Sequence, residues 1–182
     1  MLRLRNLGDL NRKRTIKPIY THTQAYPHAA TLDANFNRAA GQLTGDPASD
    51  GSKAAINPGA VMTKLADDVV TLSGATAGSK AFGLAAQFVG GDMDELHGDS
   101  TIGVWRGGGT FLLRAPAFNA TGLADAALAE DGTAGKEVYL LSDTDGRLVQ
   151  DDNAVESSTT KRAVARLITM HSDKAIEIEL LV

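Results

Sequence analysis

From residue 61 onward, apolar residues fall in short runs that are interrupted by glycine, proline and Asp-Gly pairs. In the last run, Ile176, Ile178 and Leu180 alternate with Glu177 and Glu179, which is the period-two pattern of a half-buried strand. Strands are predicted for residues 69–72, 82–89, 102–105, 110–115, 138–141, 147–149, 163–170 and 175–181. Closely spaced short strands with glycine-rich turns indicate a mainly β protein with a small β-barrel or β-sandwich body.

Two of the predicted turns have clear sequence signals. Asp145-Gly146 lies between runs 138–141 and 147–149 and indicates a hairpin. Residues 171–174 separate the last two runs and suggest a second hairpin. Within the β body, the one predicted helix is a short alanine-rich segment at 122–130. The large aromatic Trp105 is expected in the core of this body.

The first sixty residues have a different pattern. Prolines recur at positions 18, 27, 47 and 58, and residues 44–58 have the composition of a loop or linker. A short helix is predicted near 32–42. Single apolar anchors without periodicity lie between the prolines: Ile16, Ile19, Tyr20, Tyr26, Leu32, Phe36 and Leu43. We therefore predict an extended N-terminal arm and linker at 1–60, followed by the β domain at 61–182.

The net charge of the chain also changes sign near residue 60. The net charge of −4 combines eight Lys+Arg and four Asp+Glu in residues 1–60 with ten and eighteen in residues 61–182, or +4 and −8. The basic start contains Arg3, Arg5, Arg12, Lys13, Arg14 and Lys17. An acidic protein surface is the favoured partner of this arm. Nucleic acid is the minor alternative, because only Tyr20 and Tyr26 are nearby for stacking and the body is acidic; a solvated tail is a further alternative.

Patterns typical of catalysis are not found. The chain has no cysteine, which agrees with synthesis in a reducing cytoplasm, and no eighteen-residue apolar run that would span a membrane. Residues 74–80 resemble a P-loop, but Ser79 interrupts the required spacing. Asp92 to Asp99 could hold a hard cation but departs from the EF-hand pattern. His22, His28, His97 and His171 are dispersed. We therefore expect no enzyme activity, cofactor or metal.

Two stretches carry a resemblance to a known family. AFGLAAQFVGGDMDEL and IGVWRGGGTFLLRAPAF lie within residues 81–118, and GKEVYLLSDTDGRLVQ and KRAVARLITMHSDKAIEIELLV lie near the end of the chain. Together, residues 69–182 resemble the head decoration (cement) proteins of tailed bacteriophages. The resemblance implies a structural virion protein on the capsid exterior, made in the host cytoplasm. It also implies binding to the major capsid protein, often as homotrimers, which stabilises contacts between capsid subunits.

The arm supplies the expected contact residues. Its isolated apolar side chains need the surface of another molecule, and its basic residues suit an acidic one. The predicted capsid-binding residues are Arg3, Arg5, Arg12, Lys13, Arg14, Lys17, Ile19, Tyr20, Tyr26 and Phe36. Two alternatives stay open. One is another phage structural part, such as a head–tail connector or tail-tube subunit; the other is a β-barrel glycan- or metal-binding module around Asp92–Asp99 and Trp105.

Overall fold

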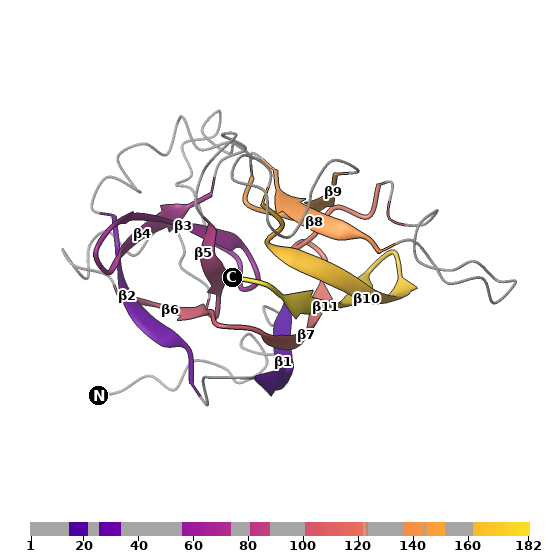
Figure 1. Cartoon of the computed structure of the whole chain (residues 1–182), viewed down its shortest axis with the longest axis horizontal. Helices are drawn as coiled ribbons and strands as arrows, with labels where there is room; N and C mark the ends of the chain where they lie inside the picture. The colour runs from indigo at the N-terminus through magenta and orange to yellow at the C-terminus, as the bar shows by residue number, and fades with distance from the viewer. Residues whose placement is uncertain are drawn as a thin grey trace, which may run out of the picture.

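The computed structural model describes residues 15–21, 26–33, 56–73, 81–87, 101–121, 123, 137–143, 145–151 and 162–182. These residues form eleven strands and no helix (Figure 1). The strands are β1 (Ile16–Thr21), β2 (His28–Leu32), β3 (Val61–Ala66), β4 (Val69–Leu72), β5 (Ala81–Ala85), β6 (Thr101–Trp105), β7 (Gly109–Arg114), β8 (Tyr139–Ser142), β9 (Leu148–Gln150), β10 (Ala165–Ser172) and β11 (Ala175–Leu180). This described part of the chain therefore contains no helix that is long and apolar enough to cross a membrane.

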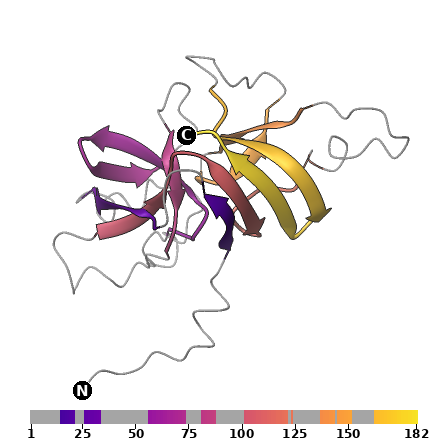
Figure 2. The same cartoon turned by 60° about the horizontal axis from the view of Figure 1, so that its bottom comes forward.

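Two assemblies share these strands. Strands β2-β4-β3-β5-β6 close into a barrel, and the other six form an open sheet in the order β1-β7-β11-β10-β8-β9. The barrel and the sheet lie side by side in both views (Figures 1 and 2). All named pairs are antiparallel except β2 with β4. The mainly β prediction is therefore confirmed, in the form of a barrel joined to a sheet.

All eight predicted strands are present as β4 to β11, with ends shifted by a few residues. The β10–β11 hairpin is also confirmed. β3 was not predicted. The predicted helix at 32–42 begins at Leu32, which lies in β2 instead, and residues 34–42 lie outside the described part. The predicted helix at 122–130 also lies outside it, apart from Leu123.

The predicted arm needs a correction, because two strands come from it. β1 pairs with β7, where Ile16 lies opposite Leu113, and β2 lies between β4 and β6 in the barrel. Ile16, Ala30 and Leu32 are buried, so burial of these side chains holds the segment in the body. Residues 15–21 and 26–33 thus belong to the sheet and barrel instead of extending from them, and residues 1–14, 22–25 and 34–55 lie outside the described part.

A polar contact also ties the start of β1 to the body. The buried Thr15 hydroxyl donates a hydrogen bond to the Pro58 carbonyl, just before β3. Pro18 occupies an edge strand, where its missing N–H is tolerated. The recurring prolines predicted an extended arm, but a proline is compatible with a strand at this edge of the sheet.

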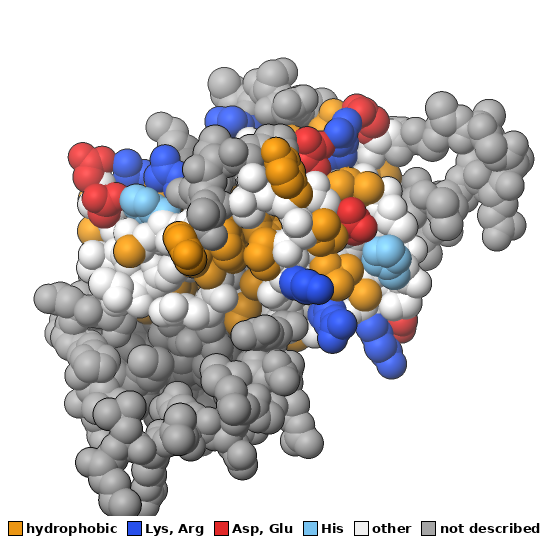
Figure 3. Space-filling view, turned by 90° about the horizontal axis from the view of Figure 1, so that it is seen from below, with side chains coloured by type: hydrophobic (Ala, Val, Ile, Leu, Met, Phe, Trp, Pro, Cys, Tyr) orange, Lys and Arg blue, Asp and Glu red, His pale blue; other side chains and the backbone are white. Residues whose placement is uncertain are grey.

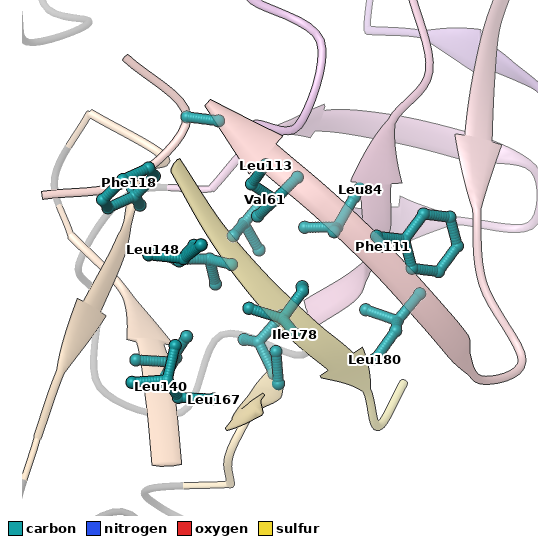
Figure 4. Packing of buried hydrophobic residues seen from close by; sticks show 14 of the residues in the cluster. Val61, Leu84, Phe111, Leu113, Phe118, Leu140, Leu148, Leu167, Ile178 and Leu180 are labelled. Atoms are coloured by element: carbon teal, nitrogen blue, oxygen red, sulfur yellow. The ribbon is translucent and has the colours of Figure 1, made fainter. Parts of the chain in front are cut away.

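The barrel and the sheet share one hydrophobic core. Neighbouring side chains on a barrel strand point to opposite sides. Met62 packs with other barrel residues in a cluster inside the barrel, whereas Val61 packs in a second cluster that barrel and sheet residues share. Leu84 likewise lies near Phe111 and its neighbours on the inner face of the sheet (Figure 4). Trp105 belongs to the same cluster. The Trp105 and Phe111 ring centroids are 5.6 Å apart, which confirms that Trp105 is a core residue.

The predicted Asp-Gly hairpin between β8 and β9 forms a second link. The Asp143 carboxylate accepts hydrogen bonds from the backbone N–H groups of Asp145 and Arg147, both at 2.8 Å. Gly146 follows with φ +75°, and its carbonyl accepts a hydrogen bond of 2.7 Å from the Val61 N–H of β3. The turn of the sheet therefore docks on a barrel strand.

Candidate interaction surface

β1 is the outermost strand of the sheet and carries the main exposed apolar group. Its first residue, Ile16, points into the shared core, whereas Lys17, Pro18, Ile19 and Tyr20 are exposed. The exposed fractions are 53% for Ile19 and 62% for Tyr20. Two adjacent large apolar side chains on a sheet edge make this strand a candidate contact surface.

A β-bulge explains why both side chains reach solvent. Pro18 pairs with Phe111 and Tyr20 pairs with Thr110, so Ile19 is an extra residue without an opposite number on β7. In a regular strand, neighbouring side chains point to opposite faces. A bulge breaks this alternation and turns a side chain outward.

The register also defines an outer face of the sheet, on the side away from the shared core. Lys17 lies opposite Leu112, which lies opposite Glu177; Tyr20 lies opposite Thr110, which lies opposite Glu179. These residues alternate with buried ones along β7 and β11. Hydrophobic side chains run across the middle of the molecule's lower face, with charged groups around them (Figure 3).

The acidic side of the outer face, over β8, β10 and β11, has internal polar partners. Arg166 contacts Glu137 at 2.7 Å and Glu179 at 2.5 Å. The Tyr139 hydroxyl also donates to Glu137, and these two partners, Tyr139 foremost and then Arg166, lower the pKa of Glu137. The same ion pairs, with Glu179 foremost, raise the pKa of Arg166. His171 lies 3.5 Å from Glu177.

The predicted binding residues divide into described and undescribed ones. Lys17, Ile19 and Tyr20 lie together on β1. Tyr26 is 82% exposed and precedes Pro27, whose ring lies over Gly103 of β6, so Tyr26 sits beside the barrel. The remaining predicted residues lie outside the described part: Arg3, Arg5, Arg12, Lys13, Arg14 and Phe36.

Two further exposed aliphatic residues are not predicted by the sequence. Leu65 of β3 is 56% exposed and Ile168 of β10 is 45% exposed. Each lies where the strand register shifts, as Ile19 does. The sequence signal for such a bulged, exposed residue is a pair of consecutive apolar residues within a strand, as in Leu167-Ile168. The bulge itself depends on the partner strand, so the sequence does not locate it.

Candidate chemistry elsewhere is sparse. His28 lies 3.3 Å from Asp68 and edge-on to Phe82, and the Arg106 guanidinium lies over the Phe82 ring at 4.6 Å. Within the ranges that the structure describes, no group of three His, Asp or Glu side chains could hold a metal ion. Residues 74–80, the Asp92–Asp99 stretch, His22 and His97 lie outside those ranges.

Comparison with known proteins gives one match. A family model described as phage cement protein matches residues 4–181, which is almost the whole chain. No curated protein and no solved structure matches.

Proposed function

Because this chain belongs to the phage cement protein family, we propose that it binds the outer surface of the assembled head and stabilises contacts between neighbouring major capsid protein subunits. The family makes it a structural protein of the phage capsid. Membership in a structural family also supports the proposal that the chain is not an enzyme.

The exposed pair Ile19 and Tyr20 carries this proposal. Burial of apolar surface contributes about 25 cal/mol per Å² and is the main source of affinity at protein contacts. Large, partly polar aromatics such as tyrosine are also enriched among the residues that dominate binding energy. β1 presents both side chains on a strand that is anchored by pairing with β7, so little ordering entropy opposes their burial.

The other predicted residues extend the proposed contact. Lys17 is exposed on this strand, and Tyr26 is exposed beside the barrel. We further propose that Arg3, Arg5, Arg12, Lys13, Arg14 and Phe36 contact the shell, and that the protein acts as a homotrimer. Repetition over a lattice multiplies a modest affinity per copy into durable attachment.

Addition of purified protein to heads that lack it tests the proposal. We expect saturable binding in hundreds of copies, consistent with a capsid lattice, and a rise in the temperature at which heads disrupt. The double variant Ile19→Ser/Tyr20→Ser should bind at least about tenfold more weakly, because two exposed anchors are lost. Leu65→Ser is the matched control, since it removes an exposed aliphatic from the barrel end.

Failure of the unchanged protein to bind heads would overturn the proposed function. Binding in only about a dozen copies would favour a connector instead. Equal weakening by the double variant and by Leu65→Ser would remove β1 from the contact while leaving head binding intact.

A further inference from the structure

Three basic side chains gather at one corner of the outer face, where β1 begins and β7 ends. Arg114 lies opposite Ala175 in the sheet. The carbonyl of Lys174, the residue before Ala175, accepts a hydrogen bond of 3.1 Å from the N–H of Ala115. Lys17 lies opposite Leu112, two residues before Arg114 on the same face. We call Lys17, Arg114 and Lys174 the basic corner. Lys and Arg side chains are visible together beside the hydrophobic band (Figure 3).

The basic corner differs from the rest of this face in its pairing. Arg166 has two carboxylate partners and His171 lies beside Glu177. None of the three basic-corner side chains is in an ion pair within the described part of the chain, although all three are exposed. Two carboxylates lie nearby: Asp173 in the β10–β11 turn, and Glu177, which lies opposite Leu112. The corner therefore has three positive groups against two negative ones.

This local excess of +1 stands in a chain whose net charge is −4. Unpaired like charges that lie close together repel one another, which costs some stability in the free protein. An acidic partner would turn that cost into attraction. Apolar groups adjoin the corner: the half-buried Leu112 lies opposite Lys17, and the exposed Tyr20 follows Lys17 on the same strand.

We propose, resting on the proposed function, that the β1–β7 half of the outer face docks an acidic surface of the major capsid protein that presents carboxylates around an apolar centre. Tyr20 and Leu112 supply the apolar contact, and the basic corner supplies charge complementarity. Such an arrangement gives attraction at a distance and orientation at contact. Among the described residues, the other half of the face carries Glu137, Glu177 and Glu179 around the single Arg166, so it has less to offer an acidic partner.

A pair of double variants with equal net charge tests the proposal. Lys17→Glu/Arg114→Glu reverses the corner, and Lys64→Glu/Arg162→Glu reverses two exposed bases elsewhere; each double variant changes the net charge by −4, from −4 to −8. Binding is measured on heads assembled without DNA. Lys17→Glu/Arg114→Glu should bind about tenfold or more weakly, and the control pair less than about threefold.

Two further measurements sharpen the result. Binding of the unchanged protein should weaken between about 50 and 500 mM salt, and binding of the corner variant should respond less. The charge-preserving Lys17→Arg/Arg114→Lys should retain binding. Urea unfolding of every variant shows whether lost binding reflects lost folding.

Several outcomes would overturn the proposal while leaving head binding intact. Equal losses in both charge-reversal pairs would indicate general repulsion instead of a docking face. Unchanged binding of the corner variant would remove this face from the contact. If the corner variant loses self-association in sedimentation, or binding to a short DNA duplex, and still coats heads, the face belongs to a second copy or to nucleic acid. Absence of head binding by the unchanged protein would instead refute the proposed function.

Discussion

The five barrel strands form a closed ring of backbone pairing, whereas the six-stranded sheet ends at β1 and β9. Ion pairs occur in both regions, but on the sheet they are unevenly distributed. At the barrel, His28 lies beside Asp68 and Lys64 lies 2.9 Å from Asp67. On the sheet, the basic corner has no such partners in the described residues. A closed barrel offers no strand edge for pairing with another chain, whereas the open sheet has two.

The largest expected effect would break the link between the two regions. Phe111→Ala removes a fully buried ring that contacts Trp105 of the barrel from a strand of the sheet. We expect a loss of about 3–5 kcal/mol in the free energy of unfolding, the usual cost of emptying a large aromatic site. Urea unfolding followed by tryptophan fluorescence and by circular dichroism measures it.

Both probes should report one transition, because Val61, Leu84 and Trp105 of the barrel strands pack in the same cluster as the buried side chains of the sheet. Leu112→Ala is the matched control, since its side chain lies on the outer face and is only half-buried. Two separate transitions, or equal losses in the two variants, would show that the barrel and the sheet are energetically independent.

A smaller effect is expected at the hairpin that docks on the barrel. A Cβ added at Gly146 would lie 2.6 Å from the Leu72 Cδ1 atom of β4, and φ is +75°. Gly146→Ala should therefore cost about 1–3 kcal/mol through strain and displacement. Urea midpoints measure the loss.

Gly146→Asn separates the two causes, because asparagine adopts positive φ more readily than alanine. We expect Asn to be no better than Ala, since its Cβ meets the same Leu72 methyl. Full stability in both variants would show that the turn does not rest tightly on β4.

Local sequence signals account for the strands that were predicted. Alternation of Ile176 and Ile178 with glutamates defines β11, and Asp145-Gly146 defines the turn before β9. β1 and β2 lack such signals. Only Ile16 of β1 is buried, and Pro18 interrupts the strand. β2 is short, and its partners β4 and β6 lie far away in the sequence, so pairing rather than local preference places it.

The candidate surface shows the same division. Ile19, Tyr20 and Tyr26 were selected as anchors that need a partner, and the structure leaves all three exposed; their role in binding stays a prediction. Arg114 and Lys174 lie far from Lys17 in the sequence and join it only through the β1–β7–β11 register. Sequence spacing cannot reveal a cluster that is assembled by sheet order.

The smallest expected effect concerns the paired, acidic side of the outer face. Tyr139 and Arg166 lower the pKa of Glu137 below its usual value of 4.5. A carboxyl group whose pKa is lower in the folded state stabilises the protein above its unfolded pKa, and loses this contribution as pH falls through the folded value. Glu137→Gln should therefore shift the urea midpoint slightly downward near neutral pH, and the difference should disappear as the pH falls below the lowered pKa of Glu137. The effect is small because Glu137 is fully exposed to solvent. A difference that grows on acidification would contradict the pairing, and would mean that the acidic side of this face is as unsatisfied as its basic corner.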